Sequence, residues 1–189
     1  MVCDLLAADD LAAIFAQQTP AENARLITFF GMIPNFEPEL ILPKLSGLLR
    51  PGDLLLFSAN LAPGNNYAAG LRTILPLYDN ALTRDWLLMF LLDLGIEKTD
   101  GRLEWTIEPC PSGHDLLCLT AWFRIEHSRS LCVAGEKFEF GAGETIRLFF
   151  SYRYTPDRVQ HQLSHQGLVV EEQWITASGE EGVFLCSRR

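Results

Sequence analysis

Residues 25–60 read RLITFFGMIPNFEPELILPKLSGLLRPGDLLLFSAN, and their alternation of apolar runs with an amphipathic stretch decides the fold. The runs Arg25–Gly31 and Leu54–Asn60 predict strands, the first apolar on both faces as buried parallel strands are. Between them, Glu37-Pro38 predicts the opening of a helix. The predicted buried stripe of this helix consists of Leu40, Ile41, Leu45, Leu48 and Leu49. A strand, helix, strand unit of this kind predicts a parallel sheet in an α/β fold, with ligands at the carboxyl ends of its strands.

The segments on either side extend this pattern. Val2–Leu6 predicts a short strand that ends in Asp4, and Ala8–Gln17 predicts an amphipathic helix. The apolar face of this helix consists of Leu11, Ile14 and Phe15. Residues 65–95 predict further helix, broken at Pro76 because proline cannot donate a backbone hydrogen bond. The side chains predicted to pack inward there are Trp86, Leu87, Phe90, Leu91 and Leu94.

The pattern changes between Arg102 and Tyr154, where apolar and polar residues alternate with period two. This alternation, interrupted by glycine-containing turns such as residues 141–143, predicts an inserted antiparallel sheet. Thr155-Pro156 then predicts a helix to about Gln166, and two strands follow at residues 168–176 and 182–187. We therefore expect a Rossmann-like core in residues 1–64, an inserted helical and antiparallel region in 65–154, and a closing helix and hairpin in 155–189.

Charge and cysteine usage narrow the function classes. The 189-residue chain has a net charge of −9 and only 15 Lys and Arg residues, which argues against a nucleic-acid surface. Its five cysteines are widely spaced, with no CxxC pair and no histidine at ligand spacing, so we expect reduced thiols and no metal site. No stretch is long and apolar enough to suggest a signal peptide or membrane span. We expect a cytoplasmic protein with a small-molecule substrate, and no nucleic-acid or membrane partner.

Three blocks of the sequence resemble the histidine-specific S-adenosylmethionine-dependent methyltransferases, the family of the ergothioneine-biosynthetic histidine methyltransferase. They are RLITFFGMIPNFEPELILPKLSGLLRPGDLLLFSANL, YAAGLRTILPLYDNALTRDWL and ETIRLFFSYRYTPDRV. The resemblance, from about Leu26 to Phe184, implies a partial class I methyltransferase sheet, Rossmann-like, with helices on both faces. It further implies sheet order 3-2-1-4-5-7-6, with this chain beginning at the third strand and without the glycine-rich segment that holds the cofactor. We therefore expect weak or absent S-adenosylmethionine binding by this chain alone.

The resemblance also assigns site residues. Asp4 and Gly31 match cofactor-binding positions, and the substrate-binding positions are matched by Asn35, Tyr78, Thr83 and Ser151. An ordinary alternative exists for several of them: Asp4 and Asn35 could each cap the helix that follows, and Ser151 could be a sheet residue. Asp79-Asn80 could likewise face a ligand or mark a helix end. No residue is assigned a catalytic role.

The chain departs from the family pattern at several places. Phe149 stands where the family has a substrate-binding Glu, which argues against histidine itself as the substrate. The turn GMIPNF is one residue shorter than in the family, and the spacing to Thr83 is two residues shorter. His161 and His165 have metal-ligand spacing, but a solvated helix face explains them better. The aromatic residues Tyr67, Trp86, Tyr152 and Tyr154 are interpreted as core or rim residues rather than a cation-binding cage.

These observations predict a methyltransferase-like protein, acting on an amine or amino acid and incomplete as a stand-alone enzyme. The alternative is a non-catalytic small-molecule-binding or partner subunit that complements a chain carrying the cofactor-binding half. A third possibility is that coding sequence upstream of Met1 supplies the missing segment. Because strands one and two would flank Arg25–Gly31, we expect Val2–Leu6 to move beside that strand, or a second chain, as a homo-oligomer or complementing chain, to cover its edge.

Overall fold

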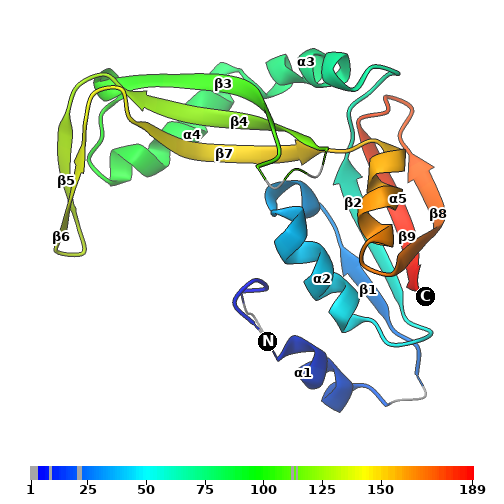
Figure 1. The fold of residues 1–189 in the computed structure, drawn as a ribbon. Coiled ribbons are helices and arrows are strands. Elements are labelled where there is room, and N and C mark those ends of the chain that lie inside the picture. The colour runs from blue at the N-terminus through cyan, green and yellow to red at the C-terminus, as the bar shows by residue number, and fades with distance from the viewer. Residues whose placement is uncertain (1–3, 9, 21–22, 112, 114) are drawn as a thin grey trace.

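The computed structural model describes residues 4–8, 10–20, 23–111, 113 and 115–189, which form a body and an arm (Figure 1). The body contains α1 (Leu11–Gln18), α2 (Pro38–Leu48), α5 (Pro156–Ser164) and the strands β1 (Leu26–Phe29), β2 (Leu54–Asn60), β8 (Leu168–Ile175) and β9 (Glu181–Arg188). The arm contains α4 (Ala81–Asp93), β3 (Gly101–Pro109), β4 (Leu117–Ile125), β5 (Arg129–Val133), β6 (Glu136–Phe140) and β7 (Thr145–Arg153). The helix α3 (Tyr67–Tyr78) and the short helices η1 (Ile33–Asn35) and η2 (Lys98–Asp100) complete the fold.

The sheet of the body has the order β1-β2-β9-β8. β1 and β2 are parallel, whereas β9 runs antiparallel to both β2 and β8. The strand ranges predicted for β1, β2, β8 and β9 agree with those observed to within a few residues. The α/β class is therefore confirmed, and the strand order corresponds to the 4-5-7-6 end of the expected sheet.

The core of the body lies between this sheet and the two helices α2 and α5, which pack on the same face. Phe57 and Ala59 of β2 line a small cavity of about 10 Å³ together with Leu42 of α2 and Val159 of α5. The Phe57 ring also stacks on Phe184 of β9 at 5.4 Å between centroids. Helices α2 and α5 therefore cover the same face of this sheet.

The sequence interpretation of the first two elements was partly wrong. Leu26 and Thr28 of β1 are exposed, so β1 is not buried on both faces, and Leu40 of α2 faces solvent while the rest of its predicted stripe is buried. The described part of the predicted strand Val2–Leu6 forms a turn at Leu5–Ala7, and its first two residues lie outside the described part of the chain. Apolar residues alone did not distinguish a sheet edge from a sheet interior.

β1 lies at the edge of the body sheet. Within the described part of the chain it pairs only with β2, and Leu26, Phe30 and Met32 beside it are exposed. The expectation that the first predicted strand moves next to β1 is therefore wrong. Coverage of this edge by a second chain stays a prediction.

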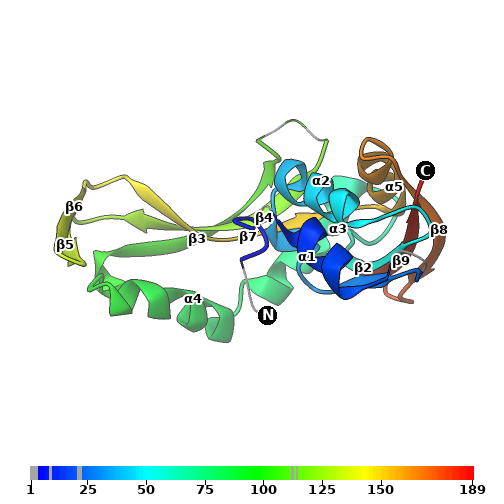
Figure 2. The same ribbon diagram turned by 90° about the horizontal axis from the view of Figure 1, so that it is seen from below.

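The arm is an antiparallel β3-β4-β7 sheet followed by the β5-β6 hairpin, as the period-two pattern predicted. Helix α4 lies along one face of the three-stranded sheet (Figure 2). Leu87 and Leu91 of α4 are buried, but Trp86 and Phe90 are 61% and 60% exposed, so their predicted inward packing was wrong. The face of α4 that packs against the sheet therefore includes fewer of its apolar side chains than the sequence suggested.

The two ends of the arm region meet at the body. The N–H of Tyr154 donates to the Asn60 carbonyl at 2.9 Å, and the N–H of Ala62 donates to the Tyr154 carbonyl at 2.8 Å. Tyr67 joins the same place, because its hydroxyl accepts from the Leu117 N–H at 2.8 Å and donates to the Arg153 carbonyl. Burial raises the pKa of Tyr67 to about 12, so the hydroxyl stays protonated.

Helix α3 continues through Pro76, where a break was predicted, and ends at Tyr78. The break falls at Asp79-Asn80, because the Asn80 side chain accepts from the Thr83 N–H and caps α4. The helix-end interpretation of Asp79-Asn80 is thus confirmed. None of the helices in the described part of the chain is both long and apolar enough to cross a membrane.

Candidate functional site

The site begins at the turn after β1. Gly31 has a φ of +71°, a left-handed conformation that favours glycine, and its N–H donates to Ser58 Oγ of β2 at 2.9 Å. A Cβ added at Gly31 would meet no atom within 4 Å. The turn is therefore open on its outer side and held to the sheet on its inner side, at the carboxyl end of β1.

Asn35 follows in η1 and connects the body to the arm. Its Nδ2 donates to the Phe150 carbonyl on β7 at 2.7 Å, while the N-cap position of α2 belongs to Glu37. The interpretation of Asn35 as a helix cap is therefore wrong. Because Nδ2 is committed to Phe150, the remaining polar atom of the amide, Oδ1, is a hydrogen-bond acceptor.

Glu37 lies at the same corner and contacts two residues of β7. Its Oε2 accepts from the Tyr152 hydroxyl, and its Oε1 lies 3.8 Å from the Arg147 guanidinium. Arg147 also lies over the Phe150 ring, 4.5 Å from its centroid. Burial, together with the hydrogen bonds to Cys110 and Glu37, raises the pKa of Tyr152, so its hydroxyl stays protonated and donates to Glu37.

The predicted substrate residues lie in different surroundings. Tyr78 packs against Trp105 and Phe149, and the Arg153 guanidinium donates to its hydroxyl. Ser151 is buried on β7 opposite Leu119 of β4, as its interpretation as a sheet residue predicted. Thr83 is half-buried in the first turn of α4. Asn35 instead lies exposed beside the Phe150 carbonyl, so Asn35 and Tyr78 both contact β7, the strand that contains Ser151.

The two predicted cofactor residues, Asp4 and Gly31, both form hydrogen bonds within the chain. Asp4 Oδ1 accepts from the Leu6 N–H at 2.9 Å and the Ala7 N–H at 3.4 Å, which stabilises a turn ahead of α1 rather than α1 itself. The Gly31 N–H is bonded to Ser58, as described above. Of these two residues, Gly31 is the one with open space on its outer side, so their fit to S-adenosylmethionine rests on the turn at Gly31.

Sequence reasoning missed several polar residues of this corner. Glu37 was assigned only to a helix start, and Arg147 carried no local signal within an alternating strand. Cys110 was counted among isolated thiols, but its Sγ lies 3.5 Å from the Tyr152 hydroxyl. No motif could have identified them, because their proximity arises from the contact between η1, α2, β3 and β7.

Two other groups of residues have structural explanations. The rings of His161 on α5 and His165, the residue after its last turn, lie 4.3 Å apart, and both residues are exposed. The Arg158 guanidinium lies over the Tyr67 ring, 3.9 Å from its centroid, while Tyr152 and Tyr154 are buried.

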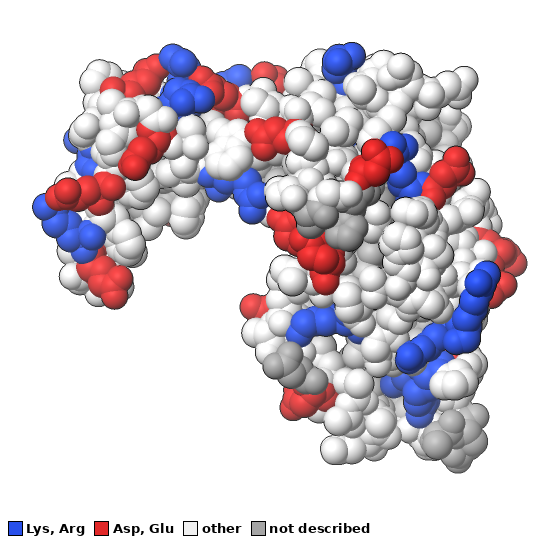
Figure 3. Space-filling view, in the orientation of Figure 1, with Lys and Arg blue, Asp and Glu red and all other residues white. Residues whose placement is uncertain are grey.

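Charged residues of both signs border the hollow between arm and body (Figure 3).

Residues 118–188 match the model of a family described as histidine-specific, S-adenosylmethionine-dependent methyltransferases. The matched segment runs from β4 to β9 and spans less than half of the chain. It contains Arg147 and Ser151 but not the turn from Gly31 to Asn35. The C-terminal part of the chain is therefore similar to this methyltransferase family. None of the curated proteins compared with the chain matches it.

Three solved structures that resemble the chain are described as methyltransferases. An S-adenosylmethionine-dependent methyltransferase from Clostridium acetobutylicum is 14% identical, with a TM-score of 0.38 over 96% of this chain and 63% of its own. The CcbJ methyltransferase from Streptomyces caelestis is 12% identical, with a TM-score of 0.35 over 90% and 64%. The glycopeptide N-methyltransferase MtfA, complexed with S-adenosylhomocysteine, is 14% identical, with a TM-score of 0.35 over 100% and 60%. The chain thus spans less than two thirds of each of these proteins.

Proposed function

We propose that this chain holds the methyl acceptor of an S-adenosylmethionine-dependent N-methyltransferase, and that the acceptor is a small amino acid or amine. The observation that carries the proposal is the family match over residues 118–188. It includes β7, the strand that contacts Asn35 and Glu37 at the corner between body and arm. The proposed acceptor site is this corner.

Asn35 is suited to orient an amine. Methyl transfer requires the nitrogen lone pair to point along the line of the bond that breaks, so the enzyme's main contribution is positioning. With Nδ2 bonded to Phe150, Asn35 Oδ1 accepts an N–H of the neutral amine. This leaves the lone pair of the amine directed away from Asn35, toward the methyl donor.

Arg147 favours an acceptor that carries a carboxylate. Its guanidinium lies over the Phe150 ring, whose own carbonyl binds Asn35, so both residues are positioned by Phe150. A guanidinium binds a carboxylate through two parallel hydrogen bonds. An amino acid with its carboxylate on Arg147 and its amine at Asn35 satisfies both groups.

The exposed edge of β1 supports a second candidate function, in which this chain is a subunit that complements a chain carrying the cofactor-binding half. β1 pairs on one side only within the described residues, and Leu26, Phe30 and Met32 are exposed along it. An unpaired strand of this kind is a template for another strand. The complementing polypeptide would add a parallel strand there and bring the glycine-rich turn close to Gly31.

Acceptor binding can be tested directly by saturation-transfer NMR with a panel of amino acids and the corresponding amines without a carboxylate. We expect binding of at least one amino acid, a loss of binding in Asn35→Ala and Arg147→Gln, and no change in the control Asn23→Ala, whose side chain is exposed on the body. Binding that is equal in all three variants, or no binding of any amino acid or amine, would refute the acceptor site.

Cofactor autonomy needs a separate experiment. Isothermal titration of S-adenosylmethionine into the purified chain is expected to show no micromolar affinity. Methyl transfer from labelled donor is expected only after a polypeptide with a glycine-rich cofactor motif is added. Micromolar binding or methylation by this chain alone would contradict the proposed incompleteness, without affecting the acceptor-site proposal.

A further inference from the structure

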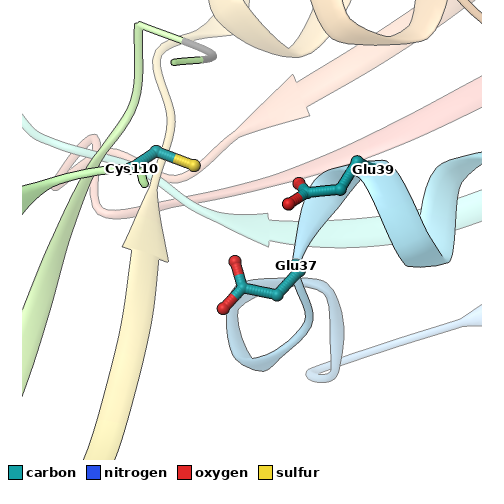
Figure 4. Close-up of side chains that lie close together, drawn as sticks. All are labelled: Glu37, Glu39 and Cys110. Atoms are coloured by element: carbon teal, nitrogen blue, oxygen red, sulfur yellow. The ribbon is translucent and has the colours of Figure 1, made fainter. Parts of the chain in front are cut away.

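Three side chains with metal-ligating atoms converge where the arm meets the body. Glu37 and Glu39 extend from the start of α2, and Cys110 follows the end of β3 (Figure 4). One carboxylate oxygen of each Glu and the Cys110 Sγ all lie within 4.8 Å of one another. Cys110 is buried, with 5% of its surface exposed, whereas Glu37 is half-buried and Glu39 exposed. The group is therefore reachable from solvent on the side of α2.

A second, independent feature is the buried hydroxyl of Tyr154. Tyr154 is 2% exposed, and its hydroxyl has no hydrogen-bond partner in the described part of the chain. Leaving a buried hydroxyl unsatisfied costs about 1–3 kcal/mol. Tyr154 belongs to the same buried cluster as Cys110 and Tyr152, and burial raises the pKa of its hydroxyl. A ligand bound beside this cluster would supply a partner for the hydroxyl.

From this convergence we propose that Glu37, Glu39 and Cys110 bind a divalent transition-metal ion, of which Zn²⁺ fits best. Zinc takes cysteine sulfur at about 2.3 Å and carboxylate oxygen at about 2.0–2.2 Å, commonly with three protein ligands and one open position. A thiolate among the ligands selects zinc over Mg²⁺ and Ca²⁺, which prefer oxygen alone. A water molecule at the fourth position would be available to accept a hydrogen bond from the buried Tyr154 hydroxyl.

The existing contacts are compatible with this chemistry. The Cys110 thiol and the Tyr152 hydroxyl are 3.5 Å apart, and Tyr152 donates to Glu37 Oε2. On metal binding the S–H bond breaks, the S–Zn bond forms and the proton passes to solvent, with no change in oxidation state. Tyr152 keeps its hydrogen bond to Glu37 and so orients this ligand, as outer partners do in other metal sites.

The expected consequence is a link between the two parts of the molecule. Two ligands belong to α2 of the body, and the third follows β3 of the arm, 71 positions further along the chain than Glu39. A metal ion that binds only the folded arrangement stabilises it. Binding should therefore raise the melting temperature of the chain.

Cobalt substitution in the reduced, full-length chain tests the site. We expect one equivalent of Co²⁺ to produce a thiolate-to-cobalt charge-transfer band, which Zn²⁺ abolishes by displacement. Cys110→Ser should remove the band, and Glu39→Gln should weaken Zn²⁺ binding at least about tenfold. Because Glu39 is exposed, Glu39→Gln is expected to fold normally and remains informative if Cys110→Ser does not fold.

Matched controls are Cys132→Ser on β5 and Glu136→Gln on β6, both exposed residues of the arm, which should leave the band and the affinity unchanged. The proposal is overturned if the wild-type chain binds no stoichiometric metal, if the band survives in Cys110→Ser, or if Glu39→Gln binds Zn²⁺ as tightly as the wild type.

Discussion

The body and the arm bury their apolar side chains in different ways. The body has one contiguous core, in which residues of β2, β9, α2 and α5 are almost fully buried. The arm has smaller clusters, and one face of α4 is left uncovered. The exposed apolar side chains of this helix are Leu82, Trp86, Met89, Phe90 and Leu92. The comparison indicates that the body carries most of the stability, while the arm depends on strand pairing and on partial cover by α4.

Charge pairs in the molecule differ in how deeply they are buried. Asp53, 1% exposed at the start of β2, accepts hydrogen bonds from the N–H of Arg25 at 2.8 Å and of Arg50 at 2.7 Å. The Arg25 guanidinium binds the same carboxylate through Nε at 2.9 Å. In the arm, Asp100 is likewise buried beside Arg129, whereas Lys98 and Asp85 form an exposed pair. Exposed pairs contribute little, whereas a buried charge left without its partner is costly.

The largest effect is expected for Asp53→Ala, which leaves the nearly buried Arg25 guanidinium without its counter-charge. We expect a loss of about 3–5 kcal/mol in the free energy of unfolding, measured by urea denaturation. The control Asp85→Ala in the arm should cost under about 1 kcal/mol. Equal losses in the two variants would break the contrast between the buried pair of the body and the exposed pair of the arm.

The same carboxylate predicts a pH dependence. Burial acts to raise the pKa of Asp53, but hydrogen bonds from the Arg25 side chain and from the N–H groups of Arg50 and Arg25 outweigh it and hold the pKa well below its usual value of 3.8. The folded pKa is below the unfolded one, so this stabilisation is present above about pH 4 and is lost as the pH falls further. The stability difference between wild type and Asp53→Ala should therefore shrink below pH 4 in urea titrations. A difference that stays constant down to pH 2 would argue against it.

A smaller effect, confined to the arm, is expected for Leu131→Ala. Leu131 of β5 packs in one cluster with Leu91 and Phe123. We expect a loss of about 2–3 kcal/mol, at the lower end for such truncations because the arm tip can relax. Hydrogen exchange should accelerate in β5, β6 and α4 and stay unchanged in β2 and β9. The control Leu82→Ala, 84% exposed, should change neither; faster exchange in the body as well would show that the two parts unfold together.

The smallest effect is expected at the junction between the two parts, for Asn66→Ala. The Asn66 side chain accepts from the Ala69 N–H at 2.9 Å and caps α3, where the chain leaves the body. Loss of such a cap costs about 1 kcal/mol in thermal or urea unfolding. Asn66→Asp should retain most of this stability, and the neighbouring exposed Asn65→Ala should be neutral. An equal loss in Asn66→Asp would mean that capping is not the cause.

Much of the fold was predictable, because helical and strand periodicities are written into a few consecutive residues. Leu54–Asn60 was predicted as a strand with its observed bounds, and the antiparallel arm followed from alternation alone. The errors fall where an apolar residue faces solvent, as at Leu26, Leu40, Trp86 and Phe90. Hydrophobicity identifies a side chain that can be buried, but whether a neighbouring element covers it depends on the rest of the chain.

The candidate site was less predictable. Asn35 was identified by resemblance, but its contact with the Phe150 carbonyl and the proximity of Arg147 were not. Tyr78 at the end of α3 and Ser151 on β7 stay predictions as substrate contacts. Cysteine spacing predicted no metal site, whereas the proposed metal site draws its ligands from positions that no spacing rule connects.

The sequence by itself determined the type and approximate limits of most elements, the α/β class and the acidic character of the chain. Only the tertiary structure decided that β1 lies at a sheet edge and that Glu37, Arg147 and Cys110 share one corner. The physical reason is range: side-chain periodicity acts over one turn or one strand, whereas the meeting of residues 37, 110 and 147 requires strand order and register, which the packing of the whole chain sets.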